Sequence, residues 1–289
     1  MLEIFTRNFD NERVESDSAS IILGDSVEIL KKIKNNSIDL IFADPPYGIG
    51  KDFGVTKDFF LNIDTYLAWC TSWIDECMRI LKPNGTMYLM YSTQFMPALD
   101  RYVDTKYYVI NRLIWKYDSS GVQPKTKFGS LYEPILMVTH SESSSYTFNY
   151  KDIMVEAKTG AVRKLIDYRK TPPQPYNSLK IPGNVWEFNR VRYKMEEYEN
   201  HPTQKPEALL ERIILASSNQ NDIVLDPFSG SFTTSAVAVR LGRKTVGIDI
   251  NPDYFKIGLR RSGIANEYAG ENLKKIRKEK LKISPKLTM

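Results

Sequence analysis

The chain has 289 residues, a hydrophobic content of 42% and a net charge of +5, which together predict a globular protein with a substantial core. No apolar run approaches the ~18 residues of a membrane span, the N-terminus lacks a signal-peptide pattern, and two histidines with two cysteines offer no metal constellation. We therefore expect a cytoplasmic protein without a membrane or metal partner, and its mildly basic charge is compatible with a polyanion.

The first half of the chain alternates between strand and helix patterns after a polar arm at residues 1–18. Strands are expected at 19–24, 38–43, 86–91, 109–115 and 132–138, and helices at 26–35, 63–82 and 94–106. The segment between the last two strands holds three lysines against one aspartate, so it reads as a basic loop.

Residues 140–200 break this alternation because they are rich in Pro, Asn, Tyr and charged residues. A stretch of this length is either an insertion with its own small fold or a functional loop. Its tyrosines, Trp186 and clustered arginines favour a recognition insert over a solvated connector.

The alternation resumes after residue 200, and the predicted fold is α/β, with a mostly parallel seven-stranded sheet and helices on both faces. Helices are expected at 206–219, 233–241 and 252–266, and strands at 222–225 and 244–248. The basic tail at the C-terminus is typical of a solvated segment, with contact to phosphates as the alternative.

The motif Asp44-Pro45-Pro46-Tyr47 ends one of the predicted buried strands. The prolines stiffen the turn, and the carboxyl edge of an open α/β sheet is where ligands bind. An aromatic ring beside a carboxylate and exposed carbonyls suits a planar substrate that carries an amine. If acceptors hold both protons of such an amine, its lone pair points outward, at an electrophilic methyl group placed there. Catalysis would then rest on positioning and electrostatics. A plain strand-ending turn is the alternative.

A second constellation spans residues 223–249, where a small-residue turn follows a strand and opens a helix. Asp249 ends the next strand, 23 residues after Asp226, a spacing that fits an acid holding ribose hydroxyls. The turn lacks the three-glycine dinucleotide pattern, so a structural β-α-β unit is an alternative. With Asp25 and Asp44, four acids are expected at the carboxyl edge of one sheet, and chance with helix capping is the lesser explanation.

These motifs resemble those of the amino-methyltransferases that use S-adenosylmethionine. Asp44-Pro45-Pro46-Tyr47 resembles their catalytic motif in the form typical of DNA adenine-N6 and some cytosine-N4 enzymes, and residues 226–231 resemble their cofactor turn. The turn follows the catalytic motif, which is the permuted order of the β class, and residues 201–206 resemble that class's own signature. The chain is thus identified as similar to β-class DNA amino-methyltransferases, and most similar to the YhdJ-type adenine-N6 enzymes at residues 115–123 and 198–202.

The resemblance implies a Rossmann-like methyltransferase fold and a role for each cofactor-binding residue, Asp44 among them. Asp249 would accept from the ribose hydroxyls, and Asp25 from the amine of the cofactor's adenine. Thr203 and Lys205 would bind the methionine carboxylate. His201 is favoured as a structural histidine, because methyl transfer to an amine needs no imidazole.

The cofactor turn would contribute four further residues. Gly230 and Ser231 would let the backbone approach the methionine part, Asp226 would lie near its amine, and Phe228 would pack on the cofactor. Phe232 stands where the family usually has Gly, so we expect altered geometry of the backbone there without loss of binding.

The resemblance also implies duplex DNA as the partner, with a target adenine flipped into the pocket of Asp44 and Tyr47. The expected organisation is an arm (1–18), a catalytic half (19–139), a target-recognition insert (140–200), a cofactor-binding half (201–268) and a basic tail (269–289). The basic residues expected to contact DNA are Lys116, Lys125, Lys127, Arg163, Arg190 and Arg192. The recognition sequence stays open, and the resemblance suggests a palindrome such as ATGCAT. Whether the protein forms a homodimer and whether it has a cognate restriction endonuclease also stay open.

Three rival functions remain. Cytosine-N4 methylation uses the same chemistry, but most such enzymes have Ser where Asp44 stands. Methylation of RNA or of a protein glutamine is disfavoured by the same aspartate and by the permuted order. A catalytically silent DNA-binding protein of this fold would not need all four acids. Cytosine-C5 chemistry is disfavoured because Cys70 and Cys77 lie inside a predicted helix.

Overall fold

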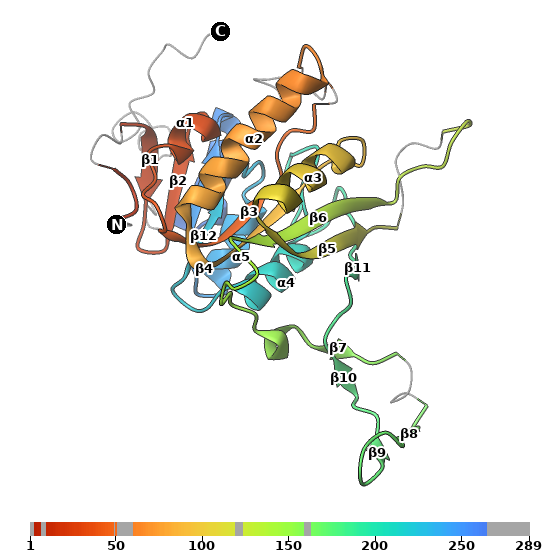
Figure 1. The fold of residues 1–289 in the computed structure, drawn as a ribbon. Coiled ribbons are helices and arrows are strands. Elements are labelled where there is room, and N and C mark those ends of the chain that lie inside the picture. Colours follow the sequence, from red (N-terminus) through yellow and green to blue (C-terminus); the bar gives the residue numbers. More distant parts are fainter. Residues whose placement is uncertain are drawn as a thin grey trace.

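A nine-stranded sheet with helices on both faces forms the centre of the computed structural model, which describes residues 3–6, 10–48, 50, 60–118, 124–158 and 163–264 (Figure 1). The order of the strands across the sheet is β1-β2-β13-β12-β3-β4-β6-β5-β11. Their bounds are β1 (Glu12–Glu15), β2 (Ala19–Leu23), β3 (Ile38–Ala43), β4 (Leu81–Met90), β5 (Tyr108–Lys116), β6 (Tyr132–Thr139), β11 (Val185–Glu187), β12 (Ile223–Asp226) and β13 (Lys244–Asp249).

The seven strands expected from the sequence make up the middle of this sheet. Strands β2, β13, β12, β3 and β4 run parallel, whereas β6 is antiparallel to both β4 and β5. The carboxyl ends of the parallel strands therefore share one edge of the sheet with the start of β6. Two edge strands were not expected, β1 antiparallel to β2 and β11 parallel to β5.

The expectation that residues 1–18 form a loose arm is therefore wrong for two stretches of it. One is β1 itself. The other is residues 4–6, where the N–H of Thr6 donates to the carbonyl of Lys32, the N–H of Lys34 donates to the carbonyl of Ile4, and Phe5 forms a bridge with Ile33. This pairing also ends the first helix at Leu30, earlier than its pattern predicts, because the chain after it bonds to the N-terminal segment instead of continuing the helix.

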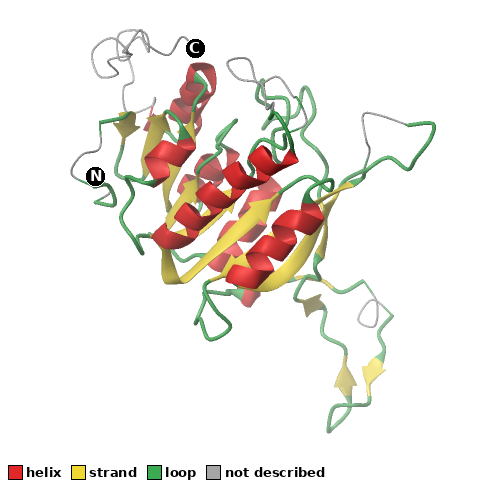
Figure 2. Ribbon diagram, turned by 45° about the horizontal axis from the view of Figure 1, so that its top comes forward, coloured by secondary structure: helices red, strands yellow, loops and turns green. Residues whose placement is uncertain are grey.

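Helices cover both faces of the sheet (Figure 2). The first three, α1 (Ser26–Leu30), α2 (Ile63–Ile80) and α3 (Met96–Lys106), share one buried cluster with the sheet. The other three, α4 (Glu207–Ser217), α5 (Thr233–Arg240) and α6 (Pro252–Arg261), pack on the opposite face. Strand β3 is apolar except for Asp39 because it is buried on both sides, with Ile41 in the first cluster and Leu40 and Phe42 in the second.

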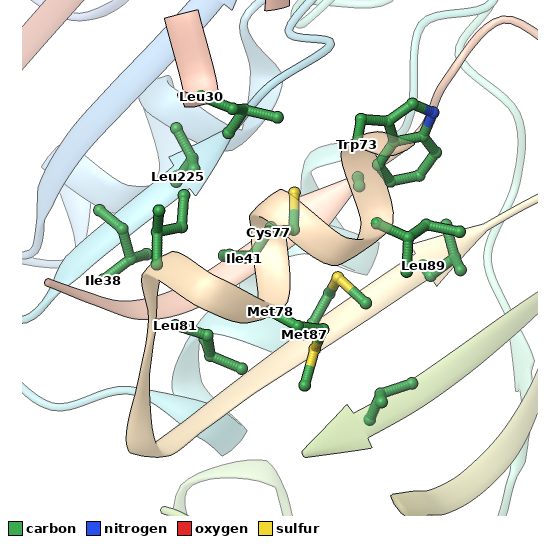
Figure 3. Close-up of a cluster of buried hydrophobic side chains, with 14 of the residues drawn as sticks. Leu30, Ile38, Ile41, Trp73, Cys77, Met78, Leu81, Met87, Leu89 and Leu225 are labelled. Carbon is green, nitrogen blue, oxygen red and sulfur yellow. The ribbon is translucent and has the colours of Figure 1, made fainter. Parts of the chain in front are cut away.

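The core between α2 and the sheet explains the positions of the two cysteines. Trp73, Cys77 and Met78 of α2 face Ile41 and Leu89 of the sheet (Figure 3). Cys70 lies in the same cluster, two turns before Cys77. Burial raises the pKa of the Cys70 thiol to about 12 and raises the pKa of Cys77 as well, so neither supplies a thiolate at neutral pH.

The insert forms an extended arm beyond the sheet (Figure 1). After the 3-10 helix η1 (Tyr150–Ile153), it contains two short antiparallel pairs, β7 (Val155–Glu156) with β10 (Leu179–Lys180) and β8 (Ile166–Asp167) with β9 (Gln174–Pro175). Its final part returns to the main sheet. There β11 joins the main sheet and Trp186, which the composition favoured for recognition, is buried in the core.

Candidate active site

A cavity of about 520 Å³ lies at the carboxyl edge of the sheet and is lined by both halves of the chain. The residues predicted for catalysis and cofactor binding all line it: Asp25, Asp44, Pro45, Pro46, Tyr47, Thr203, Lys205, Asp226, Phe228, Gly230, Ser231 and Asp249. This volume falls in the range of sites that enclose a cofactor-sized molecule.

The four acids meet here because each stands at or just after the end of a parallel strand. Asp25 and Asp44 follow β2 and β3, while Asp226 and Asp249 are the last residues of β12 and β13. Neighbouring strands in the parallel part of the sheet thus deliver four carboxylates to one edge.

Asp25 has a structural task as well as a place in the cavity wall. Its Oδ1 accepts from the backbone N–H groups of Val27 at 2.8 Å and Glu28 at 3.2 Å, which caps α1. Asp25 thus serves as the N-cap of α1, as the helix-capping alternative predicts, and it is also an exposed residue that lines the cavity.

The turn after β12 is tied to the end of β13. The N–H of Gly230 donates to Asp249 Oδ2 at 2.8 Å, and Asp226 accepts from the N–H of Phe228 at 3.0 Å and from the hydroxyl of Thr234 at 2.5 Å. Burial raises the pKa of Asp226 to about 7, and burial likewise raises the pKa of Asp249 to about 7 in spite of its backbone hydrogen bonds. A polar or cationic ligand beside these carboxyl groups would therefore change their protonation near neutral pH.

The positive φ of Gly230 explains why glycine stands in this turn. Its φ is +49°, and a Cβ at this position would lie 2.7 Å from Nε2 of His201. The His201 ring packs edge-on against Tyr254 at 4.6 Å. These contacts fit the structural role favoured for this histidine.

Phe232 does not reach the cavity. Its backbone has the left-handed φ of 55° that glycine would adopt, and its ring is fully buried on the far side of the turn. A Cβ at Gly247 or Gly258 would lie 2.7 Å from that ring. The ring fills space between β13 and α6, so the expected change in how the backbone approaches the cofactor would come from the left-handed backbone at Phe232 and not from its side chain.

An aromatic wall on α2 contributes to the cavity and was missed in the sequence. The ring of Phe228 lies 5.7 Å from Trp69 and 5.0 Å from Trp73, and Trp69 itself lines the cavity. The spacing of these tryptophans along one helix face was visible in the sequence, but such a stripe is also typical of a core.

At the other end of the cavity, three charged or polar side chains cluster around Asp44. Its two oxygens accept from the Tyr47 hydroxyl at 2.8 Å and from the ammonium of Lys205. Glu133 Oε2 also accepts from the Tyr47 hydroxyl, at 3.0 Å, and lies 3.5 Å from Lys205 Nζ. The hydroxyl of Tyr66 donates to the carbonyl of Pro46 at 3.1 Å, which anchors the turn.

Burial and charge act against each other in this cluster. Burial raises the pKa of Asp44, with Lys205 opposing the shift and Glu133 adding to it. Burial alone would lower the pKa of Lys205, but the charges of Asp44 and Glu133 outweigh it and raise that pKa. Lys205 is therefore held as an ammonium between two carboxylates.

Glu133 is a site residue that sequence reasoning missed. It stands at the start of β6, which runs antiparallel to β4, so the beginning of this strand meets the ends of the parallel ones. A search for acids at strand ends overlooks it. The ammonium of Lys205, predicted to hold a cofactor carboxylate, contacts Asp44 and Glu133 here.

Five of the six basic residues predicted to contact DNA lie in three places. Arg190 lines the cavity, with its guanidinium 4.7 Å from the Tyr117 ring centre. The exposed Lys125 and Lys127 lie on the loop after β5. Two others are paired nearby, Lys116 with Glu187 and Arg192 with Asp118.

Arg163 alone stands apart from this group, since it lies exposed on the extended arm of the insert. The chain leaves β6 for that arm at the edge of the sheet opposite the cavity. The predicted basic tail at 269–289 lies outside the described residues.

The described part of the chain contains neither a metal site nor a membrane-spanning helix. No group of three or more His, Cys, Asp and Glu side chains there is arranged to hold a metal ion. Nor is any helix there both long and apolar enough to cross a membrane.

The open, mostly parallel sheet and the cavity at its carboxyl edge are those of the Rossmann-like methyltransferase fold, which solved DNA methyltransferase structures share. A family model described as DNA methylase, covering N6 and N4 methyltransferases, matches residues 38–260. The chain belongs to this DNA methylase family.

Two curated relatives are similar over most of their length. DNA adenine methyltransferase YhdJ of Escherichia coli (strain K12) is 56% identical over 268 residues, 93% of this chain and 90% of that protein. Type II methyltransferase M.HpaI of Haemophilus parainfluenzae is 39% identical over 245 residues, 83% of this chain and 73% of that protein.

Two solved structures share the fold. PvuII DNA methyltransferase (cytosine-N4-specific) aligns with a TM-score of 0.68 at 19% identity, covering 88% of this chain and 90% of that one. The complex of M1.HpyAVI with SAM aligns with a TM-score of 0.53 at 26% identity, covering 83% of this chain and 97% of that one.

Proposed function

We propose that this protein transfers a methyl group from S-adenosylmethionine to N6 of an adenine in duplex DNA. The observation that carries the proposal is that Asp44-Pro45-Pro46-Tyr47 and the Asp226–Asp249 unit line one continuous cavity. A methyl donor in the second half can thus face an amine in the first. The 56% identity to a protein named as a DNA adenine methyltransferase supports adenine as the target.

The residues around β12 and β13 fit the cofactor. Asp249 would accept from the ribose hydroxyls, Asp25 from the adenine amine, and Phe228 would pack on the ring system with Trp69 behind it. The positive φ of Gly230 and the small side chain of Ser231 leave the backbone open to the methionine part. A sulfonium carries a positive charge, and the buried carboxylate of Asp226 would favour it.

Thr203 and Lys205 are the residues proposed for the methionine carboxylate, and both line the cavity. The contacts of Lys205 with Asp44 and Glu133 put its ammonium between the two halves of the site. To bind an anionic group of the cofactor from that position, the ammonium would have to break its contact with either Asp44 or Glu133.

The target half positions the amine. S-adenosylmethionine supplies an electrophilic methyl group, while Asp44 and the Pro45 carbonyl would accept the two N–H bonds of the adenine amine. The N6 lone pair then points at the methyl carbon, the N–C bond forms as the S–C bond breaks, and one N6 proton is lost to solvent. Tyr47 would stack on the base.

The base must leave the duplex to enter this cavity, because N6 inside the stack cannot reach a donor at the sheet edge. Arg190 at the cavity and the lysines of the loop after β5 are proposed to hold phosphates. Phe128 on the same loop is fully exposed, and an aromatic ring among lysines suits a nucleic-acid surface. The insert, with Arg163, is proposed to read the recognition sequence.

The test is incubation of the protein with labelled S-adenosylmethionine and unmodified, amplified DNA, followed by nucleoside analysis. Label in N6-methyladenine supports the proposal. Label in N4-methylcytosine would establish the cytosine-N4 alternative, and tight DNA binding without label would establish the silent DNA-binding protein. Asp44→Ala should abolish transfer, since it removes the acceptor for the amine, and leave cofactor binding mostly intact, since the other predicted cofactor-binding residues remain.

A homodimer, a cognate restriction endonuclease and a cytoplasmic location belong to the proposal as further predictions. Sedimentation with and without DNA tests the first. Sequencing that detects modified bases in host DNA tests the recognition sequence, with ATGCAT as the first candidate. Digestion of unmodified DNA by a host extract tests for the nuclease.

A further inference from the structure

Glu133 Oε2 approaches both donors that are bound to Asp44. It accepts from the Tyr47 hydroxyl at 3.0 Å and lies 3.5 Å from Lys205 Nζ. Its side chain is 16% exposed, and that of Lys205 is 8% exposed. Both donors thus have two acceptors to choose between, Asp44 and Glu133.

The arrangement presents a difficulty for methyl transfer that Glu133 resolves. Asp44 already accepts from Tyr47 and Lys205, yet the target amine requires an Asp44 oxygen as its acceptor. A cation fixed beside the amine would also oppose the positive charge that develops on N6 as the methyl group arrives. A second carboxylate can take the ammonium and the hydroxyl, and it leaves the cluster with a net charge of −1 instead of zero.

We propose that Glu133 is a positioning residue for methyl transfer, which takes over the Lys205 ammonium and the Tyr47 hydroxyl so that Asp44 can accept from the target amine. This inference rests on the proposed function. The required movement is small, because Lys205 Nζ is already 3.5 Å from Glu133 Oε2.

Glu133→Gln keeps the shape of the side chain and removes its charge. The ammonium would then stay on Asp44, so kcat should fall on the order of 10-fold to 100-fold, as expected for a misplaced reacting group. Affinity for S-adenosylmethionine, measured by titration calorimetry, should change by less than about threefold. A merely structural glutamate would instead lower the melting temperature and weaken both properties together.

The acid side of the pH profile gives an independent readout. Ionised Asp44 is the stronger acceptor for the amine. Burial raises its pKa and the charge of Glu133 raises it further, while Lys205 and the Tyr47 hydrogen bond lower it. Burial raises the pKa of Asp226, and the charge of Asp44 adds to that shift. Around Glu133 itself, Tyr117 and Arg190 complete the facing groups. Glu133→Gln should therefore move the acid limb of kcat to lower pH.

Two further variants keep the inference testable. Glu133→Asp retains the charge with a shorter reach, so it should keep the parent's acid limb and lose less kcat than Glu133→Gln. Glu211→Gln is the matched control, since Glu211 of α4 pairs with Arg240 on the surface and does not line the cavity. It should behave as the parent.

The outcomes separate this inference from the proposed function. If the parent and Glu211→Gln transfer no label to adenine, the proposed function fails first. If they do, a Glu133→Gln variant with parental kcat, or with an unmoved acid limb, overturns the role of Glu133. Should the Gln variant not fold, as judged by circular dichroism, Glu133→Asp decides: a reduced kcat with the parental acid limb supports the role, and an unchanged kcat contradicts it.

Discussion

The backbone N–H of Gly230 donates to Oδ2 of Asp249 at 2.8 Å, so the turn after β12 is bonded directly to the end of β13. The two residues stand 19 positions apart and meet because β12 and β13 are parallel neighbours. This bond fixes the orientation of the acid that is proposed to hold the ribose.

Gly230→Ala should therefore weaken cofactor binding. An alanine at a φ of +49° is strained, and its Cβ would lie 2.7 Å from the His201 ring. We expect the affinity for S-adenosylmethionine to fall about tenfold or more, and the free energy of unfolding to fall by about 1–3 kcal/mol. Titration calorimetry and thermal melting measure the two effects. Gly183→Ala is the control, because nothing lies within 4 Å of its Cβ position, and equal effects of the two substitutions would contradict the prediction.

Phe232 and Gly258 should prove energetically coupled. Removing the buried ring in Phe232→Gly should cost about 3–5 kcal/mol through the cavity it leaves, less about 1 kcal/mol of relieved backbone strain. Gly258→Ala alone should destabilise the protein because its Cβ would lie 2.7 Å from the ring. In the Phe232→Gly background the same alanine should become neutral or stabilising. A double-mutant cycle in urea tests this, and strictly additive effects would refute the packing described.

The stability of the ligand-free protein should decrease as the pH rises from 6 to 8. Asp226 and Asp249 have pKa values raised by burial to about 7, above the 3.8 of an exposed aspartate. Their contribution to stability is thus complete below pH 4 and is lost as the pH rises through 7, because the folded state resists ionisation that the unfolded state permits. Each acid should contribute about 1 kcal/mol to the decrease between pH 6 and 8.

Asp226→Asn should flatten this dependence by that amount, since an amide does not titrate. Asp17→Asn, at an exposed position in the turn between β1 and β2, should follow the parent. Urea unfolding at three pH values makes the comparison, and parallel curves for Asp226→Asn and the parent would disprove it.

The loop after β5 should make DNA binding sensitive to salt. If Lys125 and Lys127 each contact a phosphate, each substitution by Gln should reduce the slope of log K against log salt by about 1, uniformly across DNA sequences. Arg190→Gln should also lower transfer of the methyl group, because Arg190 lines the cavity. Lys106→Gln is the control, because the Lys106 ammonium at the end of α3 pairs with Asp75 of α2 and does not lie on this loop. Fluorescence anisotropy at several salt concentrations is the measurement, and unchanged slopes for both loop variants would exclude phosphate contacts there.

The amino-acid sequence alone determined the alternation of strands and helices, the parallel sheet and the four acids at its carboxyl edge. These follow from local patterns, because an apolar run that ends in Asp-Pro-Pro or Asp-Pro-Phe places its acid without reference to distant residues. What only the tertiary structure decided depends on contacts between segments far apart in the chain. Glu133 reaches Asp44 because β6 runs antiparallel, Phe232 turns away from the cofactor turn because two glycines make room for its ring, and Trp186 is buried because β11 pairs with β5. Such contacts have no signature in the spacing of residues along the chain, since it is the order and direction of the strands that create them.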